Sequence, residues 1–306
     1  MVNGKVKGFV CGTIAATTYG MNPLFTLPLY AENMTPDSVL FYRYGFAVLI
    51  LGIVLKLQGQ SLALKKNEIL PLVVSGLLFG VSSLLLYFSY QYMDAGIAST
   101  ILFVYPVMVA AIMFLFFHEK ASLLTIFCIG MALGGISLLY KGEGGQTLSI
   151  LGMLFVMLSS LSYAIYIVGV NQSSLRTMST GKLTFYALLF GLSIFIVRLN
   201  FCLDLQVIPS AKAWTNVLCM AALPTVISLV CTAVAIHCIG STPTAILGAL
   251  EPVTALFFGV LIFGERLTPR IILGVILILV AVTLIVVGKP LKEKTGVLVQ
   301  RIRRRA

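Results

Sequence analysis

An acidic residue and a proline stand side by side inside a long apolar run of this sequence. The stretch LGALEPVTALFFGV, residues 247–260, contains Glu251 followed by Pro252. A carboxylate that is protonated near neutral pH could bind an amine when charged and release it when neutral. A charged side chain in hydrocarbon costs roughly 2.5–3.5 kcal/mol on insertion scales. We therefore expect Glu251 either to bind a ligand or proton, or to be a neutral or hydrogen-bonded group that stabilises its helix.

Prolines inside apolar runs break helices at two places that matter for this chemistry. Proline has no N–H and crowds the carbonyl four residues earlier, so Pro252 frees the carbonyl of Gly248, and Pro106 frees that of Leu102. Freed carbonyls in hydrocarbon are tolerated only where protein, water or a ligand satisfies them. We expect both breaks to lie on a central cavity.

Arg43 is the other charge that we place within an apolar segment. It could meet a carboxylate, extend towards the membrane surface, or tie its helix to backbone carbonyls. Other polar side chains at helical spacing could line the same interior or simply join helices. These weaker candidates are Asn22 beside Pro23, Ser83 and Tyr87 on one segment, Tyr105 next to Pro106, and Thr225, Ser228 and Thr232 on another segment.

Composition defines the elements that must position these residues. Hydrophobic side chains make up 59% of the 306 residues and charged ones only 10%, which is outside the range of soluble domains. The apolar residues come in blocks of about 20, the length of a membrane-spanning helix. The sequence predicts an all-α integral membrane protein with ten spanning helices, at residues 8–30, 37–57, 69–92, 97–117, 122–140, 149–170, 181–201, 214–239, 242–263 and 269–288.

Several function classes are disfavoured by what the sequence lacks. The six cysteines show no CxxC spacing and only two histidines accompany them, which argues against a metal site or a disulfide framework. An enzyme would need a cluster of ionisable groups, and a phosphate-binding GxxxxGK[ST] loop is missing. The +11 net charge comes largely from the basic tail 291–306. We therefore expect no enzyme, no cofactor and no nucleic-acid partner.

An internal repeat divides the chain. Residues 101–120 align with 247–266 without gaps, and residues 33–46 align with 177–190. The matched positions include Pro106 with Pro252, Tyr105 with Glu251, Glu119 with Glu265, and Tyr19 with Tyr163. We predict two halves, 1–143 and 144–290, followed by the tail 291–306. Because each half has an odd number of spans, the second enters the membrane from the opposite side, an inverted repeat typical of secondary transporters.

Four stretches, together with this repeat, resemble the EamA branch of the drug/metabolite transporter superfamily. They are TTYGMNPLF, FYRYGF, YMDAGIASTILFVYPV and ALEPVTALFFGVLIFGERLTPRIILGVILILVAV. The resemblance covers nearly the whole chain, and it departs from the family at Tyr19, where tryptophan is common. It implies a ten-helix inner-membrane carrier, commonly an exporter of amino acids or other small metabolites.

The sequence reading thus predicts a carrier that works by alternating access, with a site between the two halves. Lys and Arg in the expected loops favour cytoplasmic termini. Amino acids are the expected cargo, with proton antiport as a possible coupling. A nucleobase or cationic-drug exporter and a channel-like uniporter stay open as alternatives. Expected partners are the small-molecule substrate, membrane lipid and protons, with the chain as a monomer or homodimer.

Overall fold

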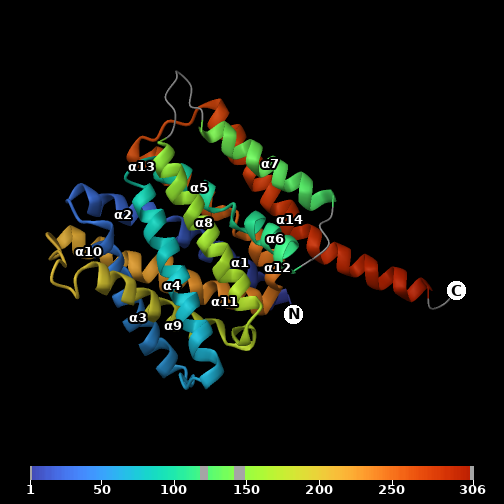
Figure 1. Ribbon diagram of the computed structural model, residues 1–306, viewed down its shortest axis with the longest axis horizontal. Coiled ribbons are helices and arrows are strands. Elements are labelled where there is room, and N and C mark those ends of the chain that lie inside the picture. Colours follow the sequence, from blue (N-terminus) through green and yellow to red (C-terminus); the bar gives the residue numbers. More distant parts are fainter. Residues whose placement is uncertain (1, 118–122, 141–148, 304–306) are drawn as a thin grey trace.

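The computed structural model describes residues 2–117, 123–140 and 149–303, and every regular element in these ranges is helical (Figure 1). The boundary expected at residues 143/144 and the repeat residue Glu119 lie outside the described residues. The helices are α1 (Val2–Gly20), α2 (Asn22–Ala31), α3 (Pro36–Leu57), α4 (Lys66–Ser89), α5 (Ala95–Leu102), α6 (Tyr105–Phe117), α7 (Leu123–Tyr140), α8 (Ile150–Asn171), α9 (Thr180–Arg198), α10 (Ala211–Ala221), α11 (Ser228–Ile239), α12 (Ser241–Leu247), α13 (Leu250–Phe263) and α14 (Pro269–Arg303).

Eight helical spans in the described part of the chain are long and apolar enough to cross a membrane, and some of them, such as Ala95–Phe117, consist of two consecutive helices. This confirms the all-α membrane class. Two expected spans are not among these eight. The first is divided at Met21 into α1 and α2, and the apolar part of α7 is confined to Leu123–Leu139. At the other end α14 continues through Arg303, so helix covers most of the segment expected to be a solvated tail.

Helix interruptions lie just before prolines in the sequence. Protein groups satisfy the carbonyls that these prolines free. Asn22 Nδ2 donates to the Tyr19 carbonyl at 3.0 Å, four residues before Pro23. Ser160 Oγ of α8 donates to the Leu102 carbonyl at 3.1 Å. The backbone N–H of Glu251 donates to the Gly248 carbonyl at 3.0 Å. Protein groups thus satisfy these carbonyls, and the expectation that both breaks lie on a central cavity stays a prediction.

A π-helical turn, Ala222–Ile227, joins α10 to α11 inside one long span. Pro224 cannot donate to the carbonyl of Met220 four residues earlier. Thr225 Oγ1 donates to that carbonyl instead, at 3.1 Å. Such π-bulges are rare and occur often at functional sites. This one turns the side chain of Thr225 into the protein interior, where it is 2% exposed.

Helices that are far apart in sequence pair side by side. The main pairs are α1 with α11, α4 with α8, α7 with α14, α4 with α9, α3 with α9, and α5 with α13. Figure 1 shows α7 and α14 as a long pair at one edge of the molecule. The polar residues discussed below come mainly from the other helices, which enclose the interior of the bundle.

Glycines permit the closest helix contacts. A Cβ at Gly76 of α4 would lie 3.0 Å from the Ala187 carbonyl of α9, and one at Gly135 of α7 would lie 2.8 Å from the carbonyl of Gly274 in α14. Small residues let membrane helices approach in this way. Gly76 and Gly135 therefore permit close helix packing within one chain.

Candidate functional site

Arg43 lies in the protein interior, two turns into α3. The side chain is 4% exposed. Its Nε donates to Thr225 Oγ1 at 3.1 Å, and its Nη1 donates to the Tyr87 hydroxyl at 2.8 Å. The guanidinium carbon lies 5.5 Å from the centre of the Tyr87 ring, a cation–π distance. Arg43 therefore neither extends to the membrane surface nor ties α3 to backbone carbonyls through these bonds.

The Tyr87 hydroxyl connects Arg43 to two further groups. It lies 3.4 Å from Asn22 Oδ1 and 3.3 Å from Met220 Sδ. Since a phenol has a single hydrogen, Tyr87 accepts from Arg43 and can donate to only one of these acceptors at a time. We call Asn22, Arg43, Tyr87, Met220 and Thr225 the central cluster. Its members come from α2, α3, α4, α10 and the π-turn.

Arg43 gives the central cluster a positive charge, and no carboxylate of the described residues lies within 4.0 Å of its guanidinium nitrogens. In the part of the chain that the structure describes, the ion pair within 4.0 Å joins Arg198 to Asp37, away from Arg43. The partners of Arg43 are neutral hydroxyls. A buried charge is stable only when it is paired or well hydrogen-bonded. The cluster is thus suited to an anionic group brought by a ligand.

Glu251, in the first turn of α13, is half-buried and close to the same region. Among the described residues its carboxylate accepts no hydrogen bond. It is near enough to interact electrostatically with the hydroxyls of Tyr19, Tyr105 and Tyr163. Tyr19 is also near enough to interact electrostatically with Arg43. Tyr19 therefore lies within electrostatic range of both interior charges.

Aromatic rings form one wall beside Glu251. Tyr105 and Tyr163 meet edge to face with ring centres 4.7 Å apart. Phe103 packs on Tyr105 at 6.0 Å, and Phe79 packs on Tyr163 at 6.1 Å. Edge-to-face contacts of this kind hold rings in fixed positions. The wall provides an apolar surface next to the carboxylate.

The remaining candidates lie outside the central cluster. Ser83 Oγ accepts the Tyr44 hydroxyl at 2.7 Å, in a neighbouring layer between α3 and α4. Ser228 Oγ donates to the Ala15 carbonyl at 2.9 Å and so joins α11 to α1. Thr232 Oγ1 donates to the Ser228 carbonyl within its own helix at 2.8 Å. The Ser228 bond therefore joins two helices, whereas the Thr232 bond stays within α11.

Tyr19, Tyr163 and Met220 belong to the site region but were not among the sequence candidates. The repeat alignment pairs Tyr19 with Tyr163, and both hydroxyls interact with Glu251. That pairing was the signal that could have found them. Met220 stands four residues before Pro224. This spacing predicts that its carbonyl lacks a helical hydrogen bond, but it does not predict a contact of its sulfur.

A family model described as the EamA-like transporter family matches residues 6–141 and 150–287. The chain belongs to the EamA-like transporter family. Two relatives of this EamA-like protein are themselves called uncharacterized transporters. The Synechocystis protein sll1319 is 29% identical over 69% of this chain and 64% of its own length. YoaV of Bacillus subtilis is 25% identical over 74% and 79%. These relatives are transporters and not enzymes.

A solved crystal structure shares the fold. It superposes with a TM-score of 0.66 over 90% of this chain and 95% of its own, at 15% sequence identity. At this level of identity the likeness concerns the arrangement of helices alone. The match with sll1319 spans less than two thirds of that relative's length.

Proposed function

We propose that this EamA-like protein is a secondary transporter that exports small zwitterionic metabolites, amino acids above all, by alternating access. The observation that carries the proposal is the pair of interior charges. Arg43 lacks an anionic partner in the described chain, Glu251 lacks a hydrogen-bond donor there, and Tyr19 interacts with both. A free amino acid would bring a carboxylate to Arg43 and an ammonium group to Glu251.

The aromatic wall favours an apolar or aromatic side chain on this substrate. Tyr105 and Tyr163 flank Glu251, so the side chain of a bound amino acid would lie against their rings. The hydroxyls of Tyr87 and Thr225 hold the guanidinium of Arg43 in place. Preorganised polar groups of this kind reduce the free energy lost when a ligand binds.

The helix pairs support a ten-span inverted repeat. In such a repeat α1 corresponds to α8 and α4 corresponds to α11, so the packed pair α4–α8 has its counterpart in the packed pair α1–α11. The other three pairs, α3–α9, α5–α13 and α7–α14, each join helices of two corresponding spans. Two structurally related halves of opposite orientation can exchange conformations, which gives inward-open and outward-open states of one molecule. The substrate site is then formed between the halves, near the membrane midplane.

Glu251 is the proposed coupling group. When charged it binds the ammonium of the substrate, and when protonated it releases it, so that a proton moves inward for each substrate that moves outward. We place the protein in a bacterial inner membrane with both termini in the cytoplasm, since Lys and Arg favour the cytoplasmic loops.

The alternatives differ in the charges they require. A cationic drug would bring a second positive charge to Arg43, which the lack of an anion near that side chain disfavours. A neutral nucleobase could stack on the aromatic wall without using either charge. A facilitative uniporter would carry the same substrate but would not depend on the protonation of Glu251.

Counterflow in proteoliposomes tests the proposal. Liposomes containing the purified protein are preloaded with one member of a panel of amino acids, nucleobases and cationic drugs, and uptake of the labelled compound is followed at two pH values. We expect saturable exchange of amino acids with apolar side chains, and we expect Glu251→Gln to abolish its pH dependence.

Glu68→Gln is the matched control, because Glu68 is a partly exposed carboxylate that accepts the backbone N–H of Lys65 at the start of α4. It should leave exchange and its pH dependence unchanged. Exchange by Glu251→Gln with the wild-type pH dependence would overturn the coupling role. Exchange of nucleobases or cationic drugs in place of amino acids would overturn the assigned substrate class.

A further inference from the structure

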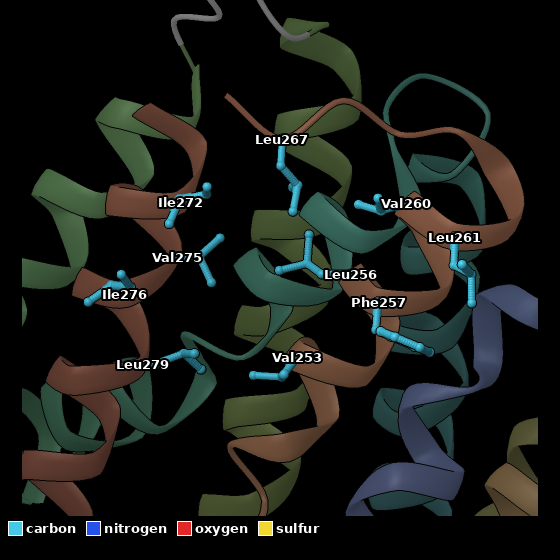
Figure 2. Close-up of a pocket in the computed structure, with 10 residues that line it drawn as sticks. All are labelled: Val253, Leu256, Phe257, Val260, Leu261, Leu267, Ile272, Val275, Ile276 and Leu279. Carbon is cyan, nitrogen blue, oxygen red and sulfur yellow. The ribbon is translucent and has the colours of Figure 1, made fainter. Parts of the chain in front are cut away.

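An apolar groove lies between α13 and α14, the last two spans of the chain. It has a volume of about 480 Å³, and its ten lining side chains are all aliphatic or aromatic. Figure 2 shows Phe257 and Leu261 on the α13 side, Ile272 and Ile276 on the α14 side, and Leu267 of the connecting loop at one end. The groove runs from that loop along about two helical turns, roughly 10 Å.

The groove exists because consecutive helices diverge. α14 packs against α7, whereas α13 packs against α5 and α1. Leu256 and Val275 are 7% exposed and form the floor, while Phe257 and Leu261 are more than half exposed at the rim. Both helices belong to membrane-length spans. The groove therefore faces hydrocarbon, and an acyl chain is the occupant whose chemistry matches its lining.

The loop end of the groove carries an exposed cation, Arg266. Arg266 is exposed and immediately precedes Leu267. The adjacent Glu265 is directed inwards, where its Oε1 accepts the backbone N–H of Gly96 at 3.1 Å. In the described residues Arg266 forms no ion pair. A guanidinium at the membrane boundary with no carboxylate partner attracts anionic lipid headgroups.

We infer that the groove between α13 and α14 binds one anionic phospholipid, with an acyl chain along the apolar lining and the headgroup phosphate on Arg266. The lipid joins two helices that otherwise lie apart. This inference does not depend on which substrate the protein carries, because it concerns the outer face of α13 and not the central cluster.

Native mass spectrometry of the delipidated full-length protein in detergent measures the affinity for the first bound lipid. Phosphatidylglycerol is compared with phosphatidylcholine of the same acyl chains. We expect phosphatidylglycerol to bind about fivefold more tightly, because one guanidinium near an anionic lipid surface contributes about 1 kcal/mol of attraction. Arg266→Gln should bring the two affinities together. Val260→Trp should weaken both lipids by filling the groove.

Matched controls separate this site from general lipid adhesion. Arg176→Gln removes one exposed arginine from another loop, and Leu49→Trp adds a ring to an exposed apolar position on α3. Both should keep wild-type affinities within about twofold. Equal affinity for the two lipids, or an Arg266→Gln variant that keeps the preference, would overturn the inference. The inference would also be overturned if the lipid-free protein formed dimers and Val260→Trp converted them to monomers. A second copy of the chain, and not a lipid, would then fill the groove.

Discussion

At the scale of single residues, binding of an anionic group would depend on how Arg43 is held. Two neutral hydroxyls and one aromatic ring surround its guanidinium, and the hydroxyls belong to residues 44 and 182 positions away in sequence. Hydrogen bonds to a charged group contribute about 1.5–3 kcal/mol each. Loss of one bond should therefore change ligand binding much more than it changes folding, since the second bond and the helix packing persist.

Tyr87→Phe tests this arrangement. The variant keeps the ring over Arg43 but removes the oxygen that accepts its Nη1–H, so the guanidinium becomes free to move. We expect affinity for the transported amino acid to fall by roughly tenfold, measured as the concentration for half-maximal counterflow.

Tyr90→Phe is the matched control for Tyr87→Phe, because the Tyr90 hydroxyl bonds Ser99 and not Arg43. It should leave the affinity within about twofold of wild type. Unchanged affinity in Tyr87→Phe would show that the substrate does not use Arg43.

A second residue, Glu265, should make the stability of the protein depend on pH. It lies in the loop after α13, where burial raises the pKa of its carboxyl from 4.5 to about 7, against the opposing effect of the Gly96 N–H. The folded protein therefore binds more protons than the unfolded chain between pH 4.5 and about 7. Stability should fall as pH rises through this window.

Glu265→Gln should remove that pH dependence. We expect the apparent melting temperature of the wild type in detergent to fall by about 2–5 °C between pH 5 and pH 7.5, and the variant to show a flatter curve. Glu68→Gln, at an exposed helix start, should keep the wild-type slope. A slope that persists in Glu265→Gln would assign the effect to another group.

At the scale of elements, prolines interrupt the helices and neighbouring groups satisfy the carbonyls that the prolines free. Besides the bonds to Tyr19, Leu102, Gly248 and Met220, Ser174 Oγ donates to the Asn67 carbonyl at 2.9 Å, four residues before Pro71. Unpaired carbonyls are costly in a membrane. These partners therefore hold the broken helices in single, defined geometries.

Ser160→Ala is the direct test at this scale. It leaves the Leu102 carbonyl buried without its side-chain donor, which should lower stability by about 1–3 kcal/mol. Thermal unfolding in detergent measures the loss. Ser193→Ala removes a hydroxyl that bonds only its own helix, at the exposed face of α9, and should be nearly neutral. Equal effects of the two substitutions would contradict the assigned role of Ser160.

The sequence was informative about elements and much less so about contacts. Apolar blocks located the spans to within a few residues, because hydrocarbon thickness constrains helix length. Polar residues within those blocks identified Arg43, Tyr87, Asn22 and Thr225, which the structure brings together. The bond from Ser160 to Leu102, and the π-turn at Pro224, could not be predicted. They depend on which helix faces are in contact, and a single sequence does not contain that information.

At the scale of the whole molecule, polar contacts tie the two halves together at one end. The loop between α9 and α10 is fixed to the start of α3 through Gln206, whose side-chain Oε1 accepts the Thr35 N–H at 2.6 Å and whose backbone N–H donates to Ser38 Oγ at 3.3 Å. Arg198 also pairs with Asp37 at this end. If the halves separate here during transport, these contacts must break in each cycle.

A disulfide across this contact should stop transport. In a Cys202→Ser background, Ser38→Cys with Gln206→Cys places two thiols where the contact now lies. We expect oxidation to reduce counterflow to about the rate of protein-free liposomes and a reductant to restore it. Each single-cysteine variant should be insensitive to oxidant. Full counterflow by the cross-linked protein would show that this end does not open.

The central claim is that Arg43 and Glu251 bind the two charges of a zwitterion. The most direct measurement is competition against labelled amino-acid counterflow by three unlabelled compounds that share one aromatic side chain: the amino acid, the amine without the carboxylate, and the acid without the amine. We expect the amino acid to compete at least about tenfold better than either analogue. Arg43→Gln should erase the advantage over the amine, and Glu251→Gln the advantage over the acid. If the amine competes as well as the amino acid in the wild type, Arg43 does not bind the carboxylate and the protein does not recognise a zwitterion in this way.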